Sequence, residues 1–362
     1  MVIKEGYKQT EIGVIPKDWE VKTLGDVLKI KHGRDQKQVQ STNGKYPILG
    51  TGGLIGFTDK FLYDKESVLI GRKGTIDKPR YMNTPFWTVD TLFYSEIFKE
   101  NSAKYLYYNF LMIDWYSYNE ASGVPSLNAK TIENISIPIP PLAEQTAIAI
   151  ALADADAMIT GLEKLLTKKR NIKRGAMRQL LQPKEGWEVK KLGEVATIVR
   201  GASPRPIEDT KWFDKQSPIG WVRISDVTKS KKVLLETTQK LSDLGVKNSR
   251  LVENGNLIMS ICATVGRPIL TTFDVCIHDG FVVFKNPQVD RQYLYYFLTF
   301  IEDNWAKSGQ TGSQMNLNTT LINNTEIPFP KSPEEQTRIA TILSDMDAEL
   351  TVLEQKLEKY KK

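Results

Sequence analysis

Basic and polar side chains recur at matching places in the two halves of this sequence, and their types suit contacts with nucleic acid. Arg and Lys bind phosphate or guanine, and Asn and Gln pair with the edge of adenine. One such loop alone is more often merely solvated, so the recurrence in both halves is what favours binding. The candidate DNA contacts are Lys31, Arg34, Lys37, Arg72, Lys73, Thr75, Ser126 and Asn128 in the first half, and Arg200, Ser203, Arg205, Arg223, Ser260, Thr264, Gln310, Ser313, Gln314 and Asn316 in the second.

Patterns that would indicate catalysis are weak by comparison. Glu20-Val21-Lys22 and Glu188-Val189-Lys190 match a triplet of metal-dependent nucleases, but no acidic partner stands at a suitable spacing, and a solvated strand edge is the plainer interpretation. The glycine cluster at 50–53 predicts a tight turn, because no helix follows it to cradle a phosphate. His32 and His278 are isolated in sequence, so neither predicts a zinc site or a catalytic dyad. With no Walker loop and no Pro-Pro-aromatic loop, we expect no catalytic residue, metal or cofactor in this chain.

The segment from Lys164 to Arg178 is strongly basic. A solvated helix face with favourable charge near a helix C-terminus would account for it. A docking surface for a partner or for the DNA backbone would account for it equally well. Both interpretations remain open.

The elements that position these residues occur twice. The motif Trp-Glu-Val-Lys-x-Leu-Gly-acid-Val begins at Trp19 and again at Trp187. Later landmarks match in the same order, while the spacing between partners grows slowly, as loop insertions in the second copy would produce. The matched landmarks are Thr75 with Thr264, Asp90 with Asp279, 105–108 with 293–296, 127–128 with 317–318, 137–140 with 327–330, and 144–146 with 335–337. The chain is therefore an internal duplication.

Each copy ends in a helical pattern that follows a Pro-containing turn. Apolar residues step by four and three, which is the spacing of a coiled-coil seam. We expect the two helices to pack antiparallel on each other; two separate surface helices, each packed on its own domain, are the alternative. The predicted seam consists of Ile148, Leu152, Ile159, Leu162 and Leu166 in the first helix, and Ile339, Leu343, Leu350, Leu353 and Leu357 in the second.

The globular parts have the patterns of a mixed α/β (α+β) fold. Short apolar runs at 67–70 and 256–259 predict strands, and 103–118 and 290–305 predict helices. Residues 36–59 and 204–241 share little, as expected for binders of different targets or for drift after duplication. The predicted organisation is a domain at 1–143, a helix at 144–182, a second domain at 183–333 and a shorter helix at 334–362.

Bulk properties set the broad class. The chain has 362 residues and a formal net charge of +6, which is compatible with a polyanionic partner without requiring one. Two cysteines give no disulfide framework. No apolar run reaches the roughly 20 residues of a membrane helix, and no signal sequence is evident, so we expect a cytoplasmic protein without membrane contact.

In this order and twice over, these motifs resemble the specificity (S) subunit of type I restriction–modification systems. The similarity covers the whole chain: the opening at 6–19, the Trp-Glu-Val-Lys motif, Ile-Pro-x-Pro, Glu-Gln-Thr and the long helices. It implies two target-recognition domains that each read half of a bipartite double-stranded DNA site, and conserved helices that set the spacer. The divergence between the two domains favours an asymmetric site over a palindrome. It further implies a non-catalytic chain that directs two modification (M) subunits, which methylate adenine with S-adenosylmethionine, and restriction (R) subunits, which use ATP and Mg²⁺.

One departure from the family pattern concerns the second helix. The first helix continues through Ile172–Leu181, whereas the second reaches Lys362 before any such segment, so the completeness of a second partner-docking surface stays open. Two rival functions also stay open: a self-sufficient nuclease or methyltransferase, and a coiled-coil scaffold that binds only protein.

Overall fold

The computed structural model describes residues 3–308 and 317–362. The chain divides into two compact units, Met1–Ile159 and Thr160–Lys362. Within the described residues, no helix combines the length and the apolar character that spanning a membrane would require.

Two four-stranded sheets form the body of the first unit. The core sheet has the order β4-β11-β8-β9 and the auxiliary sheet the order β10-β6-β7-β5. A parallel pairing joins β6 to β10, and β3 pairs with β12 beside the sheets. The elements are β1 Tyr7–Thr10, β2 Gly13–Pro16, β3 Glu20–Thr23, α1 Leu24–Val27, β4 Leu28–Lys31, β5 Gln40–Ser41, β6 Tyr46–Gly50, β7 Gly53–Thr58, β8 Ser67–Gly71, β9 Arg80–Met82, β10 Trp87–Thr88, β11 Leu92–Ile97, α2 Ala103–Met112, the 3₁₀ turn η1 Trp115–Tyr118, α3 Ala129–Glu133 and β12 Ser136–Ile139.

The second unit repeats this plan with additions. Its core sheet has the order β14-β22-β19-β20-β16, and its auxiliary sheet the order β17-β15-β21-β18, with β15 and β21 parallel. The elements are β13 Glu188–Lys191, α5 Leu192–Val195, β14 Thr197–Arg200, η2 Thr210–Trp212, β15 Gly220–Val222, α6 Ile224–Lys229, β16 Val233–Leu234, β17 Gln239–Lys240, α7 Asp243–Lys247, β18 Arg250–Val252, β19 Leu257–Ser260, β20 Pro268–Thr271, β21 Val275–Ile277, β22 Phe281–Lys285, α8 Arg291–Phe300, α9 Glu302–Ser308, α10 Thr319–Asn324 and β23 Glu326–Phe329.

Each core sheet is covered on both faces. On β8, Val68 and Ile70 belong to the cluster formed with the helices, whereas Leu69 packs with Leu49 of the auxiliary sheet. This alternation follows from the two-residue period of a strand, and burial on both faces explains why the run is continuously apolar. The second unit has the same layers, which confirms the predicted mixed α/β duplication.

The two predicted aromatic helices are each interrupted. The first ends at Met112, because Ile113 is extended and Asp114 caps the separate turn η1. Trp115 is buried there and donates from Nε1 to the Phe110 carbonyl at 2.8 Å. The second divides into α8 and α9 at Ile301.

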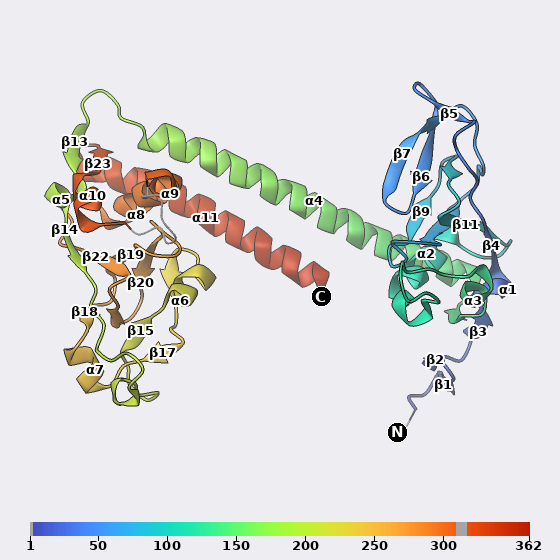
Figure 1. Ribbon diagram of the computed structural model, residues 1–362, viewed down its shortest axis with the longest axis horizontal. Helices are drawn as coiled ribbons and strands as arrows, with labels where there is room; N and C mark the ends of the chain where they lie inside the picture. Colours follow the sequence, from blue (N-terminus) through green and yellow to red (C-terminus); the bar gives the residue numbers. More distant parts are fainter. Residues whose placement is uncertain (1–2, 309–316) are drawn as a thin grey trace. The chain divides into compact units, whose positions relative to one another are not determined.

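The long helices begin and end within two residues of their predicted bounds. Helix α4 spans Leu142–Leu181, 40 residues, and α11 spans Pro333–Lys361, 29 residues. In the second unit, α11 lies antiparallel to the part of α4 that starts at Thr160 (Figure 1). Lys173 pairs with Asp347, and Glu163 pairs at 2.6 Å with Lys361 at the other end of α11, which fixes the direction. Leu162 and Leu166 are buried.

The first turns of both helices serve their own domains. Ile148 packs against the core of the first unit, and Ile339 and Leu343 belong to the core of the second. Leu152 is 41% exposed. Leu350, Leu353 and Leu357 are half-buried along α11, and Ile159 is half-buried on α4. The apolar residues thus keep their heptad spacing along each helix, while the part of the protein that they pack against changes along its length.

A buried glutamine fastens each long helix to its domain. Gln145 accepts from the backbone N–H of Ser102 at 2.9 Å and donates to the Pro140 carbonyl at 2.9 Å. Gln336 makes the matching bonds to Asp290 and Pro330 at 2.7 and 2.8 Å. Because these bonds are shielded from water, they tie the helix start to the N-terminus of α2 or α8. The repeated Glu-Gln-Thr motif therefore has a structural function.

Candidate nucleic-acid interface

The predicted contacts of the first unit gather because two strands end at one edge of the core sheet. Strands β4 and β8 both pair antiparallel with β11, so they run in the same direction. Lys31 at the end of β4 and the residues that follow the two strands, 32–34 and 72–75, therefore emerge at the same edge. At this edge Gly33 approaches the Val89 carbonyl so closely that an added Cβ would lie 2.0 Å from that oxygen.

Hydrogen bonds hold the basic loop at 72–75 against the polar loop at 122–128. The backbone N–H of Gly74 donates to the Pro125 carbonyl at 2.8 Å, and that of Leu127 donates to the Arg72 carbonyl at 2.9 Å. The Asn119 side chain accepts from Ser126 N–H at 2.9 Å and fixes the far end of the polar loop. Two loops separated by about fifty residues thus form one surface.

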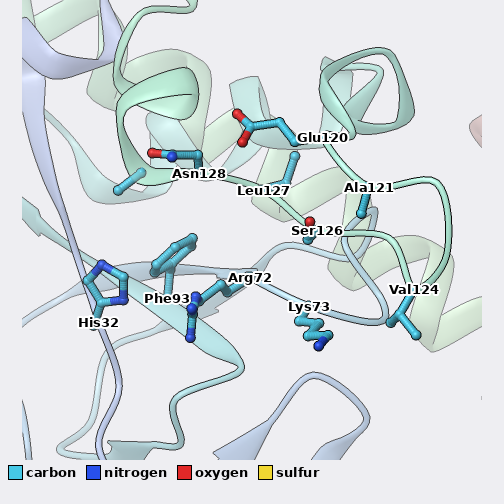
Figure 2. Close-up of a pocket in the computed structure, with 11 residues that line it drawn as sticks. His32, Arg72, Lys73, Phe93, Glu120, Ala121, Val124, Ser126, Leu127 and Asn128 are labelled. Carbon is cyan, nitrogen blue, oxygen red and sulfur yellow. The ribbon is translucent and has the colours of Figure 1, made fainter.

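This surface encloses a cavity of about 540 Å³. Figure 2 shows His32, Phe93 and Arg72 facing Glu120 and Asn128 across it. Arg72 and Lys73 are exposed, so their charges are available to phosphate or to a base edge. The lining residues are His32, Arg72, Lys73, Phe93, Glu120, Ala121, Val124, Ser126, Leu127, Asn128 and Ala129.

The predicted contacts of the first unit differ in their environments. Arg34 and Lys37 are exposed. Lys31 pairs with Glu96 at 3.1 Å, so its charge is already compensated. Thr75 is half-buried. Asn128 caps α3, since its Oδ1 accepts from the Lys130 N–H at 2.9 Å, which leaves only its amide nitrogen to donate.

In the second unit the same sheet edge carries a differently built site. Strands β14 and β19 both pair antiparallel with β22, so the loops after Arg200 and Ser260 emerge together. Ser203, Arg205 and Arg223 line a cavity of about 460 Å³. The other lining residues are Ile207, Trp221, Ile224, Ser225, His278 and Asp279.

Asp279 organises the loop of this second cavity. It accepts from Ser203 Oγ at 2.8 Å and lies 3.5 Å from Arg205 Nη2, while its carbonyl accepts from Arg200 Nε at 2.7 Å. The Ser203 hydrogen bond, above all, lowers the pKa of the Asp279 carboxyl below its ordinary value. The carboxylate therefore stays ionised and holds the polar groups of the loop toward the cavity.

His278 lies beside Asp279 in a partly buried position. Burial, followed by the charge of Arg223, lowers the pKa of its imidazole below the ordinary value of 6.5. Its Nδ1 accepts from the Gly280 N–H at 2.9 Å, which is the neutral form's hydrogen bond. At neutral pH the ring thus presents a neutral edge to the cavity.

One predicted contact is wrong. Ser260 is fully buried, and its hydroxyl donates to the Thr264 carbonyl within a tight loop, so it has no access to DNA. Thr264 is half-buried and lies 3.4 Å from the Thr228 hydroxyl. Gln310, Ser313, Gln314 and Asn316 lie outside the described residues.

Sequence reasoning missed several lining residues. His32 and His278 are not among the predicted contacts, yet each lines a cavity. Asp279 is a repeat landmark that matches Asp90, and this recurrence is the sequence signal for its role. Across the described parts of the chain, no three His, Cys, Asp or Glu side chains cluster as ligands for a metal ion.

The basic segment of α4 has a further role that neither sequence interpretation included. Lys169, Arg170 and Lys173 pair with Glu349, Glu354 and Asp347 of α11. Other basic residues of the segment, including Lys164, Lys168, Arg174 and Arg178, are exposed. Part of the positive charge therefore holds the helix pair together, and part faces solvent.

Comparison with known proteins gives concordant matches over almost the whole chain. The family model of the type I restriction modification DNA specificity domain matches residues 16–174 and 184–361. The MjaVIII specificity subunit of Methanocaldococcus jannaschii is 25% identical over 420 residues, covering 99% of this chain and 93% of that protein. A putative type I specificity subunit of Mycoplasma pneumoniae is 22% identical and covers 88% and 87%.

Solved structures show the same fold. The S subunit of a type I restriction–modification system from M. genitalium superposes with a TM-score of 0.64 at 15% identity, covering 100% of this chain and 95% of that one. The HsdS subunit from Thermoanaerobacter tengcongensis gives a TM-score of 0.51 at 16% identity, covering 94% and 92%.

Proposed function

The chain belongs to the type I restriction–modification DNA specificity family, and from that premise we propose that each unit reads one half of a bipartite DNA site. Members of this family are specificity subunits and do not carry the catalytic step of their complex. The observation that carries the proposal is the pair of cavities at one edge of each core sheet, each bordered by exposed basic side chains. Such groups recognise phosphates and base edges.

The two halves of the site should differ in sequence. The first cavity presents Arg72, Lys73 and an asparagine amide, whereas the second presents Arg205, Arg223 and a neutral histidine. Different donors and acceptors select different bases in the major groove. An asymmetric site therefore follows more naturally from these surfaces than a palindrome.

The long helices would set the unspecified spacer between the two half-sites. Helix α4 is continuous from one unit into the other, and its 40 residues correspond to about 60 Å at 1.5 Å per residue. The pairing with α11 stiffens the part of α4 after Thr160. A stiff spacer fixes a distance, as a ruler between two binding heads requires.

The chemistry would reside on partner subunits. Two modification subunits would methylate adenine with S-adenosylmethionine, and restriction subunits would use ATP and Mg²⁺ for translocation and cleavage. Double-stranded DNA and these subunits are the proposed partners. The exposed basic residues of α4 are available for either.

Exchange of the first domain, residues 19–141, for that of another family member tests the assignment. The hybrid is purified with its modification subunits, and the methylated sites are mapped on genomic DNA. One half of the recognised sequence should change while the other half and the spacer persist. A hybrid in which both halves change, or neither changes, would show that the domains do not read separate half-sites.

A further inference from the structure

A lysine-binding arrangement occupies the second unit where α8 meets α11. Tyr296 donates from its hydroxyl to Asp347 at 2.8 Å, and Lys173 of α4 pairs with the other oxygen of that carboxylate. Lys173 Nζ also lies 5.6 Å from the Tyr296 ring centre. A second lysine, Lys232, donates to the Tyr296 hydroxyl at 3.0 Å. One carboxylate and its tyrosine thus hold two ammonium groups.

The first unit contains the same tyrosine–aspartate pair. Tyr108 donates from its hydroxyl to Asp156 at 2.8 Å, as Tyr296 does to Asp347. Burial and the neighbouring carboxylate raise the pKa of Tyr108, so its hydroxyl keeps the proton that it donates. The two pairs occupy matching positions of the duplication, since 107–108 matches 295–296 and Asp156 lies on α4 where Asp347 lies on α11.

The two units differ in whether a basic side chain pairs with this aspartate. Within the described residues, no Lys or Arg makes an ion pair with Asp156. Arg80 points its guanidinium at the carbonyls of Gly50 and Thr51, at 3.1 and 2.8 Å, and Lys104 lies over the Tyr81 ring. Lys232 lies directly before β16, which is the last strand of the core sheet in the second unit. The core sheet of the first unit ends at β9 instead.

An open cavity of about 450 Å³ adjoins Asp156, and Arg80 and Lys104 also line it with their charged ends held by the Gly50 and Thr51 carbonyls and over the Tyr81 ring. Tyr81, Tyr107 and Tyr108 form an aromatic wall, with Tyr107 5.3 Å from Tyr108 and 6.1 Å from Tyr81 between ring centres. Aromatic faces together with a carboxylate favour an ammonium group. Beside the cavity, Leu152 and Met158 expose apolar side chains on α4, at 41% and 43%.

We propose that the Tyr108–Asp156 cavity receives a lysine side chain from a helix of the modification subunit. In the second unit the lysine on the equivalent pair comes from a helix antiparallel to the one that bears the aspartate, and it is flanked by apolar residues such as Leu166 and Met177. A partner helix that lies antiparallel along the first half of α4 would present the same features. A second copy of this chain is a poorer occupant, because its Lys173 is already paired with its own Asp347.

This inference rests on the proposed function, and one experiment separates the two. Binding of the purified full chain to its modification subunit is measured for wild type, for Asp156→Asn and for Tyr108→Phe, at low and moderate ionic strength. Asp156→Asn should weaken binding roughly tenfold or more, with a smaller loss for Tyr108→Phe and a weaker salt dependence in the aspartate variant. Asp154→Asn is the matched control, since Asp154 lies exposed on the same helix outside the cavity.

The outcomes are distinct. If wild type fails to bind the modification subunit, the proposed function and this inference both fall. If wild type binds and Asp156→Asn binds equally well, the inference alone is overturned. If Asp156→Asn instead alters only self-association, measured by sedimentation, the partner assignment is wrong. Thermal unfolding of each variant, expected to match wild type, shows that a loss of binding does not reflect misfolding.

Discussion

Arg72 is the residue of the first unit whose position most directly suits DNA contact. It is exposed at the cavity rim, and its Nη1 donates to the Asp90 carbonyl at 3.2 Å, which orients the guanidinium. Arg72→Ala should weaken DNA binding of the assembled complex and reduce the slope of log affinity against log salt by about 1 if the contact is a phosphate. Fluorescence anisotropy across a salt series measures both quantities.

Lys22→Ala provides the control for charge alone. Lys22 lies on β3, before β4 begins and so away from the loop end of that strand, and pairs with Glu20 at 2.7 Å. The variant has the same net charge as Arg72→Ala. Equal losses of affinity in both variants would show that the cavity has no special role.

His278 should make the second unit sensitive to acid. Its pKa in the folded protein lies below the ordinary value of 6.5, so the unfolded chain binds a proton first as the pH falls. The stability contributed by the neutral ring is complete above about pH 6.5 and is lost as the pH falls through the lowered pKa. Denaturant unfolding of wild type and His278→Gln at pH 7.5 and pH 5.5 should show a smaller pH effect in the variant. An identical pH effect in both would assign the acid sensitivity to other groups.

For single residues, the sequence predicted the chemical type of the side chains at the cavities better than it predicted their burial and hydrogen bonds. Arg72, Lys73, Arg205 and Arg223 line the cavities, because basic side chains after strand ends face solvent. Ser260 could not be distinguished from an exposed serine, since its burial depends on a loop that folds back on β19. Spacing along a chain does not show which polar side chain bonds to its own backbone.

Among the ion pairs that join α4 to α11, the pair of Lys173 and Asp347 is shielded from water. Lys173 and Asp347 are 17% and 29% exposed, and Asp347 also accepts from Tyr296. Asp347→Ala should lower the free energy of unfolding by about 1–3 kcal/mol, because it leaves the lysine and the tyrosine hydroxyl without their partner. Chemical denaturation followed by circular dichroism gives the value.

Glu349→Ala is the comparison for a pair at the surface. Glu349 is 47% exposed and pairs with Lys169 at 2.6 Å. Its removal should change the free energy of unfolding by no more than about 0.5 kcal/mol. Similar losses for both variants would mean that shielding from water does not distinguish the two pairs.

The heptad pattern predicted helices and their bounds closely, because the Pro residues before each helix limit where it can begin. It could not assign partners. Ile339 and Leu343 continue the same spacing as Leu350 and Leu353, yet the former pack into the domain core. A period of seven specifies which face of a helix is apolar, and tertiary packing specifies what covers that face.

For the whole molecule, the helix that joins the units offers a test of the spacer. Asp156 of α4 accepts a hydrogen bond from Tyr108 within the first unit, and Glu163 of α4 pairs with Lys361 of α11. Seven residues of helical sequence inserted after Ala157 would leave both sets of contacts in place. The insertion adds about 10 Å, or about 3 base pairs, to the unspecified spacer.

Mapping of methylated sites in cells that carry the lengthened chain measures this change. The two half-sites should keep their sequences while the spacer alone grows. An unaltered spacer would mean that α4 does not set the distance. The duplication and the fold class were predictable because ordered motif pairs are insensitive to loop insertions. The strand order of the auxiliary sheets was not, because β5, β6, β7, β15 and β17 lie in the divergent segments 36–59 and 204–241.

The hydrogen bonds of Gln145 and Gln336 at the helix starts have a consequence for recombination between genes of this family. Gln145 and Gln336 occupy the same short motif and make the same bonds, and both domains open with the same tryptophan motif. A crossover between two genes at these motifs would transfer a complete domain together with the glutamine that bonds it to the helix. Hybrid genes should therefore encode folded proteins without further adjustment, and new DNA specificities can arise by exchange of whole domains in one generation rather than by gradual substitution.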